Sequence, residues 1–270
     1  MRSDRAVALC ICTGLLAAAV VSGPVLAPAS NDELAPIRVD VARGLPAEAL
    51  DPLFALPPLT FRGVPSRGQV IYRECVNGVV LIASTKTIGS GVVVSRHGDI
   101  VTNEHVVREA YRARGDDWLA VWFKPPKGAR PAKDQFLLGK VVQRDARRDL
   151  AHVRLVQTMP ATASVIPLAS VMPDVGQDVF TIGHPKTFLW SFSQGVVSQI
   201  RPDYQWRYPD GVARSATAIQ TQATIDAGSS GAPLLDDKGA VVGIVVGSAA
   251  EAQGVYFAVS VQHVRELLPR

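Results

Sequence analysis

Much of what would mark a chemically specialised chain is missing from this sequence. It has no strong charge of one sign, since 28 basic and 24 acidic residues leave a formal net charge of +4, and this argues against nucleic-acid binding. Its five histidines and three cysteines lack metal-ligand spacing, and no glycine-rich nucleotide loop is present. We therefore expect no metal, no cofactor and no nucleic-acid partner. What remains is a globular composition, 47% hydrophobic and 19% charged over 270 residues, which excludes a wholly disordered chain.

The N-terminus has the pattern of an export signal. Two arginines precede an apolar run over residues 6–21, and Ala27 and Ala29 suit a small-residue cleavage site. We predict a signal peptide over residues 1–29 and a bacterial periplasmic or secreted location, with an uncleaved membrane tether as the alternative. Cleavage would remove two of the three cysteines and leave Cys75 as a small buried hydrophobe without a disulfide partner.

The rest of the chain divides into an arm and a β-rich region. Residues 30–68 carry six prolines without helical or alternating periodicity, which indicates an extended arm or linker. From about residue 69, short Val, Ile and Leu runs follow one another between turn residues, which predicts an all-β domain over 69–270. The expected strands are 79–84, 91–95, 118–123, 136–143, 150–156, 178–182, 192–199, 218–222, 241–246 and 255–259.

Two groups of strands are expected in this β-rich region. A proline-containing stretch over residues 159–176 separates them and would connect two barrels, one over about 69–160 and the other over about 173–259. Only the tail has helical spacing, because Val261, Val264 and Leu268 share one face behind Ser260. We expect a short C-terminal helix there.

A serine cluster raises the question of chemistry. In Gly228-Ser229-Ser230-Gly231, two serines lie between two glycines just before an apolar strand. Gly and Ser are ordinary turn residues, so a surface turn would explain the composition. Alternatively, one serine is a nucleophile on a tight turn whose backbone N–H groups face a substrate carbonyl.

A nucleophilic serine needs a base and an acid that orients the base. Of the five histidines, His105 lies where the apolar run Ile100-Val101 ends, whereas the others fall in turns, within a strand or on the terminal helix. For the acid, Asp149 immediately precedes an apolar strand and can point inward, while Asp145 stays in the loop. Taken singly, each residue also fits a purely structural role.

Together these segments resemble the trypsin-like serine proteases, most closely the HtrA/Deg branch of bacterial envelope proteases. The resemblance covers about residues 69–270, and its motifs are 89–95, 98–107, 149–153, 219–231, 239–244 and 256–260. It implies two six-stranded antiparallel β-barrels and serine endopeptidase activity on polypeptide substrates. The family's order of histidine, aspartate and serine falls on His105, Asp149 and Ser230, and the resemblance implies an oxyanion hole from the backbone N–H groups of Gly228 and Ser230.

The chain departs from the family pattern in two places. Ala232 stands where many relatives have a second glycine, and the resemblance ends at Arg270 without the peptide-binding PDZ domain that many members carry. Substrate capture through such a domain is therefore not carried over. The family's frequent trimer is not carried over either, so the oligomeric state stays open.

Specificity is indicated only by a few residues. Thr224 lies where trypsin has the aspartate that pairs with Lys or Arg, so we do not expect a basic preference. We expect Ile244, Val245 and Val246 to offer apolar walls and a strand edge for an extended peptide. The hypothesis is cleavage after small or medium aliphatic residues of unfolded chains.

Two other functions compete with an active protease. An α/β-hydrolase esterase would need a glycine where Ala232 stands and a helix after the serine, and the chain offers neither. A protease-like peptide-binding or chaperone module would keep the groove with a resting or inactive site. Turnover that Ser230→Ala abolishes would separate the protease from both.

Overall fold

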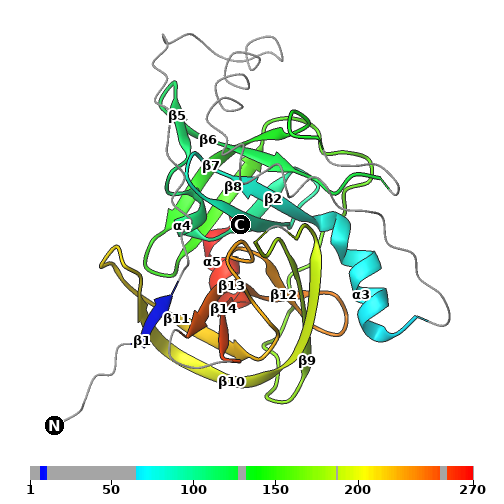
Figure 1. Cartoon of the computed structure of the whole chain (residues 1–270), viewed down its shortest axis with the longest axis vertical. Helices are drawn as coiled ribbons and strands as arrows, with labels where there is room; N and C mark the ends of the chain where they lie inside the picture. Colours follow the sequence, from blue (N-terminus) through cyan, green and yellow to red (C-terminus); the bar gives the residue numbers. More distant parts are fainter. Residues whose placement is uncertain (1–6, 11–64, 127–131, 187, 250–253, 270) are drawn as a thin grey trace.

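The computed structural model describes residues 7–10, 65–126, 132–186, 188–249 and 254–269 (Figure 1). The predicted arm over 30–68 lies outside the described residues up to residue 64, and so does the predicted signal segment except for β1 (Val7–Cys10). Strand β1 pairs in parallel with β10 and antiparallel with the end of β13, at Ser248 and Ala249.

The first barrel is formed by strands from the N-terminal half of the described chain. The strands β2, β3, β4, β8, β7 and β6 are hydrogen-bonded in this order, and a β2–β6 pairing closes the ring. A further strand, β5, extends the sheet beside β6. The bounds are β2 Val79–Ala83, β3 Ile88–Val93, β4 Asp99–Thr102, β5 Tyr111–Ala113, β6 Asp116–Trp122, β7 Leu137–Asp145 and β8 Leu150–Leu155.

The second barrel repeats this plan with the C-terminal strands. The ring β10, β11, β14, β13, β12 and β9 is closed by a β9–β10 pairing, and all pairs within the ring are antiparallel. The bounds are β9 Asp178–Gly183, β10 Ser191–Arg207, β11 Ala213–Thr221, β12 Pro233–Leu235, β13 Val241–Ala249 and β14 Tyr256–Ser260. The prediction of two six-stranded antiparallel barrels is confirmed.

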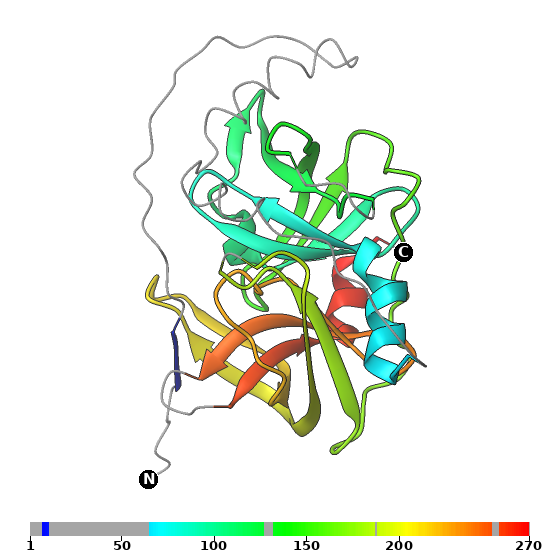
Figure 2. The same cartoon turned by 45° about the vertical axis from the view of Figure 1, so that its right-hand side comes forward.

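Short helices accompany the barrels. Helix α5 (Val261–Leu267) begins at the predicted Ser260 cap, whose hydroxyl accepts from the Gln262 N–H. Helix α3 (Arg67–Cys75) and the 3-10 turn η2 (Val76–Gly78) precede the first barrel, where the sequence analysis expected an arm and then strands. The four-residue helix α4 (Glu104–Val107) follows β4. Figure 2 shows α3 and α5 beside the second barrel.

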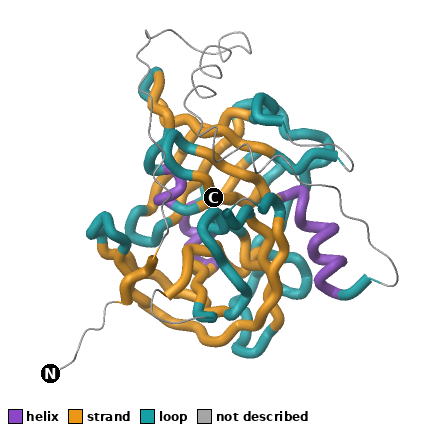
Figure 3. The backbone as a smooth tube through the Cα atoms, viewed as in Figure 1, coloured by secondary structure: helices purple, strands orange, loops and turns teal. Residues whose placement is uncertain are grey.

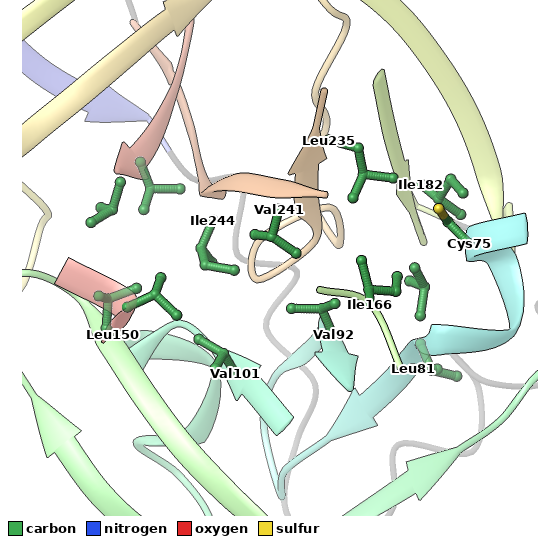
Figure 4. Packing of buried hydrophobic residues seen from close by; sticks show 14 of the residues in the cluster. Cys75, Leu81, Val92, Val101, Leu150, Ile166, Ile182, Leu235, Val241 and Ile244 are labelled. Carbon is green, nitrogen blue, oxygen red and sulfur yellow. The ribbon is translucent and has the colours of Figure 1, made fainter. Parts of the chain in front are cut away.

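The largest apolar cluster joins the two barrels rather than filling either one. Along β2, Leu81 belongs to this shared cluster, while Val80 and Ile82 pack in a cluster confined to the first barrel, as the alternation of side chains along a strand requires. Figure 4 shows Val92 and Val101 of the first barrel close to Val241 and Ile244 of the second, with Ile166 of the connector near Val92. The close packing of this interface fixes the two barrels against each other, so side chains from both can be held in fixed relative positions there.

No helix in the described part of the chain is long and apolar enough to cross a membrane.

Candidate active site

His105 lies on α4, directly after the end of β4. Val106 and Val107 on the same short helix are fully buried, so the helix is anchored by its apolar side chains. Asn103 precedes the helix and donates from its side-chain amide to the Asp149 carbonyl, 2.9 Å away. This bond ties the end of β4 to the turn that carries the aspartate.

Asp149 lies in the turn between β7 and β8 and is fully buried. Its backbone φ of +56° is left-handed, a conformation that Asp tolerates better than most residues. The carboxylate accepts from the His105 backbone N–H at 2.9 Å through Oδ1, and Oδ2 lies 2.7 Å from His105 Nδ1. Two contacts therefore fix the histidine, one to its main chain and one to its ring.

The charge state of Asp149 determines the tautomer of His105. Burial alone would raise the pKa of Asp149, but the charge of His105 and hydrogen bonds from His105 and Tyr208 hold it below its ordinary value. An ionised carboxylate only accepts hydrogen bonds, so the hydrogen lies on His105 Nδ1. The other ring nitrogen, Nε2, is left to accept a proton, as a general base requires.

Ser230 lies on a turn between β11 and β12 that requires glycine on both sides. The backbone φ is +92° at Gly228 and +85° at Gly231. A Cβ at Gly228 would lie 2.2 Å from the His184 carbonyl oxygen, and one at Gly231 would lie 2.1 Å from the Ser90 carbonyl oxygen. Neither position admits a side chain, which is why the serines stand between glycines.

Main-chain contacts hold this turn against both barrels. The Ser230 carbonyl accepts from the Ser90 N–H at 2.8 Å, and the Gly231 N–H donates to the Val245 carbonyl at 2.9 Å. Gly89 lies between the two halves of the site, because a Cβ there would be 2.7 Å from a Val106 methyl and 3.1 Å from the Ser230 carbonyl oxygen. The helix that carries His105 and the turn that carries Ser230 thus pack against one residue.

The backbone N–H groups expected to bind an oxyanion are unengaged. Within the described residues, neither Gly228 nor Ser230 donates its N–H to a hydrogen bond. The Ala227 carbonyl accepts from the Lys186 N–H at 2.6 Å. Because a trans peptide is planar, this contact directs the Gly228 N–H of the same peptide unit the opposite way. Among the described residues, the turn that carries Ser230 thus keeps two backbone donors without an acceptor.

Ser230 is the candidate nucleophile and His105 the candidate base. Among the described side chains, no hydrogen bond joins the Ser230 hydroxyl to His105. Such bonds are often long in the absence of substrate and shorten in the reacting complex.

Two side chains that sequence reasoning left out support the serine turn. The Ser90 hydroxyl donates to the Gly228 carbonyl at 2.8 Å and lies 2.9 Å from His184 Nδ1. Since a hydroxyl has one hydrogen, His184 Nδ1 donates to Ser90. Burial lowers the pKa of His184 to about 3, so the ring stays neutral. The sequence Gly183-His184-Pro185 indicates only a turn, whereas His184 is fully buried and packs against the turn that carries Ser230.

The remaining histidines lie elsewhere. His152 is buried in β8 with Nε2 2.6 Å from Asp99 Oδ1, and His263 Nε2 accepts from the Thr217 N–H on β11. His97 is exposed in a turn. No group of three or more metal-ligating side chains occurs among the described residues.

The predicted specificity residues need a correction. Ile244, Val245 and Val246 are each at most 2% exposed and belong to the apolar clusters. Val245 also uses its own N–H and carbonyl to bind Ala232 and Gly231. These side chains are framework, not open walls, because a strand that alternates between two packed clusters has no free face. Thr224, in contrast, is exposed.

Comparisons with known proteins agree with this architecture. The profile of the trypsin-like peptidase domain matches residues 89–244. The chain is 33% identical to the chloroplastic protease Do-like 5 of Arabidopsis thaliana over 67% of its own length and 56% of that protein's. It is 30% identical to the serine endoprotease DegS of Haemophilus influenzae over 67% of its length and 49% of the relative's. The chain thus spans about half the length of these curated relatives.

A solved structure shows the same fold. The serine endoprotease from Yersinia pestis superposes with a TM-score of 0.57 at 24% identity, over 76% of this chain and 66% of that one. At this identity the likeness bears on the fold alone, whereas the domain profile spans more than half of the sequence. On these grounds the chain belongs to the trypsin-like serine peptidases, in their HtrA/Deg branch.

Proposed function

We propose that this protein is a serine endopeptidase that hydrolyses polypeptides through Ser230, His105 and Asp149. The observation that carries the proposal is the buried Asp149 carboxylate, which holds both the main-chain N–H and the Nδ1 of His105 at 2.9 and 2.7 Å. A histidine on a surface turn does not need such a fixed ring, whereas a general base does.

Each group has a role in the reaction. His105 Nε2 takes the proton of the Ser230 hydroxyl as the oxygen attacks the substrate carbonyl. The N–H groups of Gly228 and Ser230 stabilise the negative oxygen of the tetrahedral intermediate. The C–N bond breaks as His105 returns the proton to the leaving amine, and an acyl-enzyme remains. Water then attacks, giving its proton to His105, and the new carboxyl end leaves as Ser230 regains its hydrogen.

The substrates are proposed to be unfolded exported polypeptides in the periplasm or outside the cell. The support is the signal-like pattern of residues 1–29 and the names of the curated relatives, which are proteases. Thr224 is exposed and uncharged at the position discussed above, so we retain the expectation of cleavage after small or medium aliphatic residues. A peptide-library profile dominated by Lys, Arg or Glu at the cleaved position would contradict this preference.

The test is labelling with a fluorophosphonate probe together with casein digestion by the purified protein. Ser230→Ala should abolish labelling and lower casein hydrolysis by at least about a thousandfold, since it removes the nucleophile. Ser229→Ala is the matched control, because it makes the same change one residue away. It should retain both activities.

Other outcomes favour the competing functions. No labelling in any form, with binding of unfolded casein retained, would indicate a peptide-binding or chaperone module. Turnover of esters without any peptide cleavage would indicate an esterase.

A further inference from the structure

The hairpin that joins β10 and β11 carries buried polar groups that the proposed reaction does not use. It belongs to the second barrel, and its loop lies on the same side of the molecule as α4 of the first barrel (Figures 1 and 3). Tyr208 and Arg214 flank this loop and are 6% and 1% exposed. A fully buried guanidinium and a buried phenol beside a short loop are costly unless each has a specific partner.

Tyr208 contacts both members of the acid–base pair. Its hydroxyl donates to Asp149 Oδ2 at 2.7 Å, the same oxygen that His105 Nδ1 contacts. Its ring lies edge-on to the His105 ring, with 5.2 Å between centroids. Burial, and then the charge of Asp149, raise the pKa of Tyr208 well above its ordinary value, so the phenol remains a donor throughout the working pH range.

Arg214 also contacts the tyrosine ring. Its guanidinium carbon lies 4.3 Å from the Tyr208 ring centroid, a cation–π contact. The same guanidinium pairs with Asp210 at 2.8 Å and lies 3.8 Å from Glu104 on α4. Arg108, also next to α4, pairs with Glu104 and with Asp210. Charges of both signs therefore fasten the hairpin of one barrel to the histidine-bearing helix of the other.

We propose that Tyr208 is a positioning residue for the peptidase reaction, holding the Asp149 carboxylate through its hydroxyl and the His105 ring through its own ring. This inference rests on the proposed function. With two donors on Oδ2 and one on Oδ1, the carboxylate cannot rotate about its last bond without losing a hydrogen bond. The His105 ring then stays in the plane that directs Nε2 toward the nucleophile.

The test compares Tyr208→Phe with Tyr204→Phe. Tyr204 lies on the same hairpin, and its ring stacks on Phe257 with 4.6 Å between centroids, so the control removes a hydroxyl without touching Asp149. Steady-state cleavage of a fluorogenic peptide should show a kcat about tenfold lower for Tyr208→Phe, because Asp149 loses one charge-assisted hydrogen bond. KM should stay within about twofold, and Tyr204→Phe should match the wild type.

A second measurement requires neither turnover nor a variant. In the wild-type protein, an NMR nuclear Overhauser effect should connect the Tyr208 ring protons with the low-field Nδ1 proton of His105. If this signal is present while the wild type cleaves nothing, the proposed function fails and the geometry of the inference stands. Absence of the signal, equal kcat for the two Phe variants, or an effect confined to KM would overturn the role of Tyr208.

Discussion

The two barrels contribute opposite kinds of group to the candidate site. In the first barrel, the Asp149 carboxylate accepts three hydrogen bonds and His105 is held at its main chain and its ring. In the second barrel, the turn around Ser230 is held by main-chain bonds, and among the described residues the N–H groups of Gly228 and Ser230 have no acceptor.

This difference matches what the proposed reaction requires of each half. A general base works only in one tautomer and one orientation, so the groups that hold it must make all of their hydrogen bonds. An oxyanion hole works only if its donors are still free when charge develops. The proposed role of the turn agrees with this, because other contacts fix the turn and leave those two N–H groups unused among the described residues. Substitutions that disturb the acid–base pair and substitutions that disturb the serine turn should therefore have different effects.

The largest effect is expected at Gly231. Ala at this position would place a Cβ 2.1 Å from the Ser90 carbonyl oxygen and 2.2 Å from Thr102 Oγ1, with a backbone φ of +85°. Both neighbours belong to the first barrel, so the turn would have to withdraw from it. Gly231→Ala should lower the free energy of unfolding by at least about 3 kcal/mol and abolish activity, as measured by urea denaturation and peptide cleavage.

A matched glycine separates the clash from the backbone strain. Gly115 has a φ of +82°, and nothing lies within 4 Å of a Cβ built there. Gly115→Ala should therefore cost only about 1 kcal/mol, from the left-handed backbone, and should leave activity intact. Equal destabilisation by the two substitutions would show that contact with the first barrel does not fix the serine turn.

The sequence predicts the barrels better than the support of the site. Short, nearly continuous apolar runs located strands such as β2, β6 and β8 closely, because these strands are buried on both faces along most of their length. Helix α3 was missed although Ser66 and Gln69 form a capping box. The capping box can be read in the sequence, but it lies at the end of a proline-rich stretch and belongs to a helix of only nine residues.

Tyr208 could not be found from the sequence for a different reason. The predicted strand ended at residue 199, whereas β10 continues to Arg207. Pro202 interrupts the apolar alternation, and the register between β10 and β11 shifts from Arg201 to Tyr204, so an irregularity lets the strand pass a proline. The hairpin's contact with Asp149 is then a matter of tertiary packing, which no local pattern encodes.

The next effect concerns the neutral imidazole behind the serine turn. Because the pKa of His184 is lowered to about 3 by burial, the unfolded chain binds a proton that the folded chain does not, at every pH between that value and about 6.5. Stability therefore falls as the pH is lowered through this window. The wild type should lose about 2 kcal/mol from this group between pH 7 and pH 5.

His184→Asn tests this linkage, because an amide Nδ2 can replace Nδ1 as the donor to Ser90. Urea denaturation at several pH values should give the variant a shallower loss of stability on acidification, even if it is less stable at pH 7. His97→Asn, in an exposed turn, should retain the wild-type slope. Identical slopes for the wild type and His184→Asn would mean that His184 is already protonated in the folded protein.

The smallest effect should come from Ser90, a residue of the first barrel whose side chain bonds to the serine turn of the second barrel. Tyr208 reaches from the second barrel to the acid–base pair, and Ser90 reaches from β3 of the first barrel to the Gly228 carbonyl. Ser90→Ala leaves that carbonyl without its donor, so we expect the turn of the proposed oxyanion hole to sample orientations with a misdirected N–H. We expect kcat to fall about tenfold, or about 1.4 kcal/mol, with KM little changed. Ser95→Ala, whose hydroxyl binds Asp99 across the turn between β3 and β4, should not alter kcat in the same peptide-cleavage assay. Equal kcat for Ser90→Ala and the wild type would show that main-chain contacts, among them the bond from the Ser90 N–H to the Ser230 carbonyl, hold the turn without the Ser90 hydroxyl.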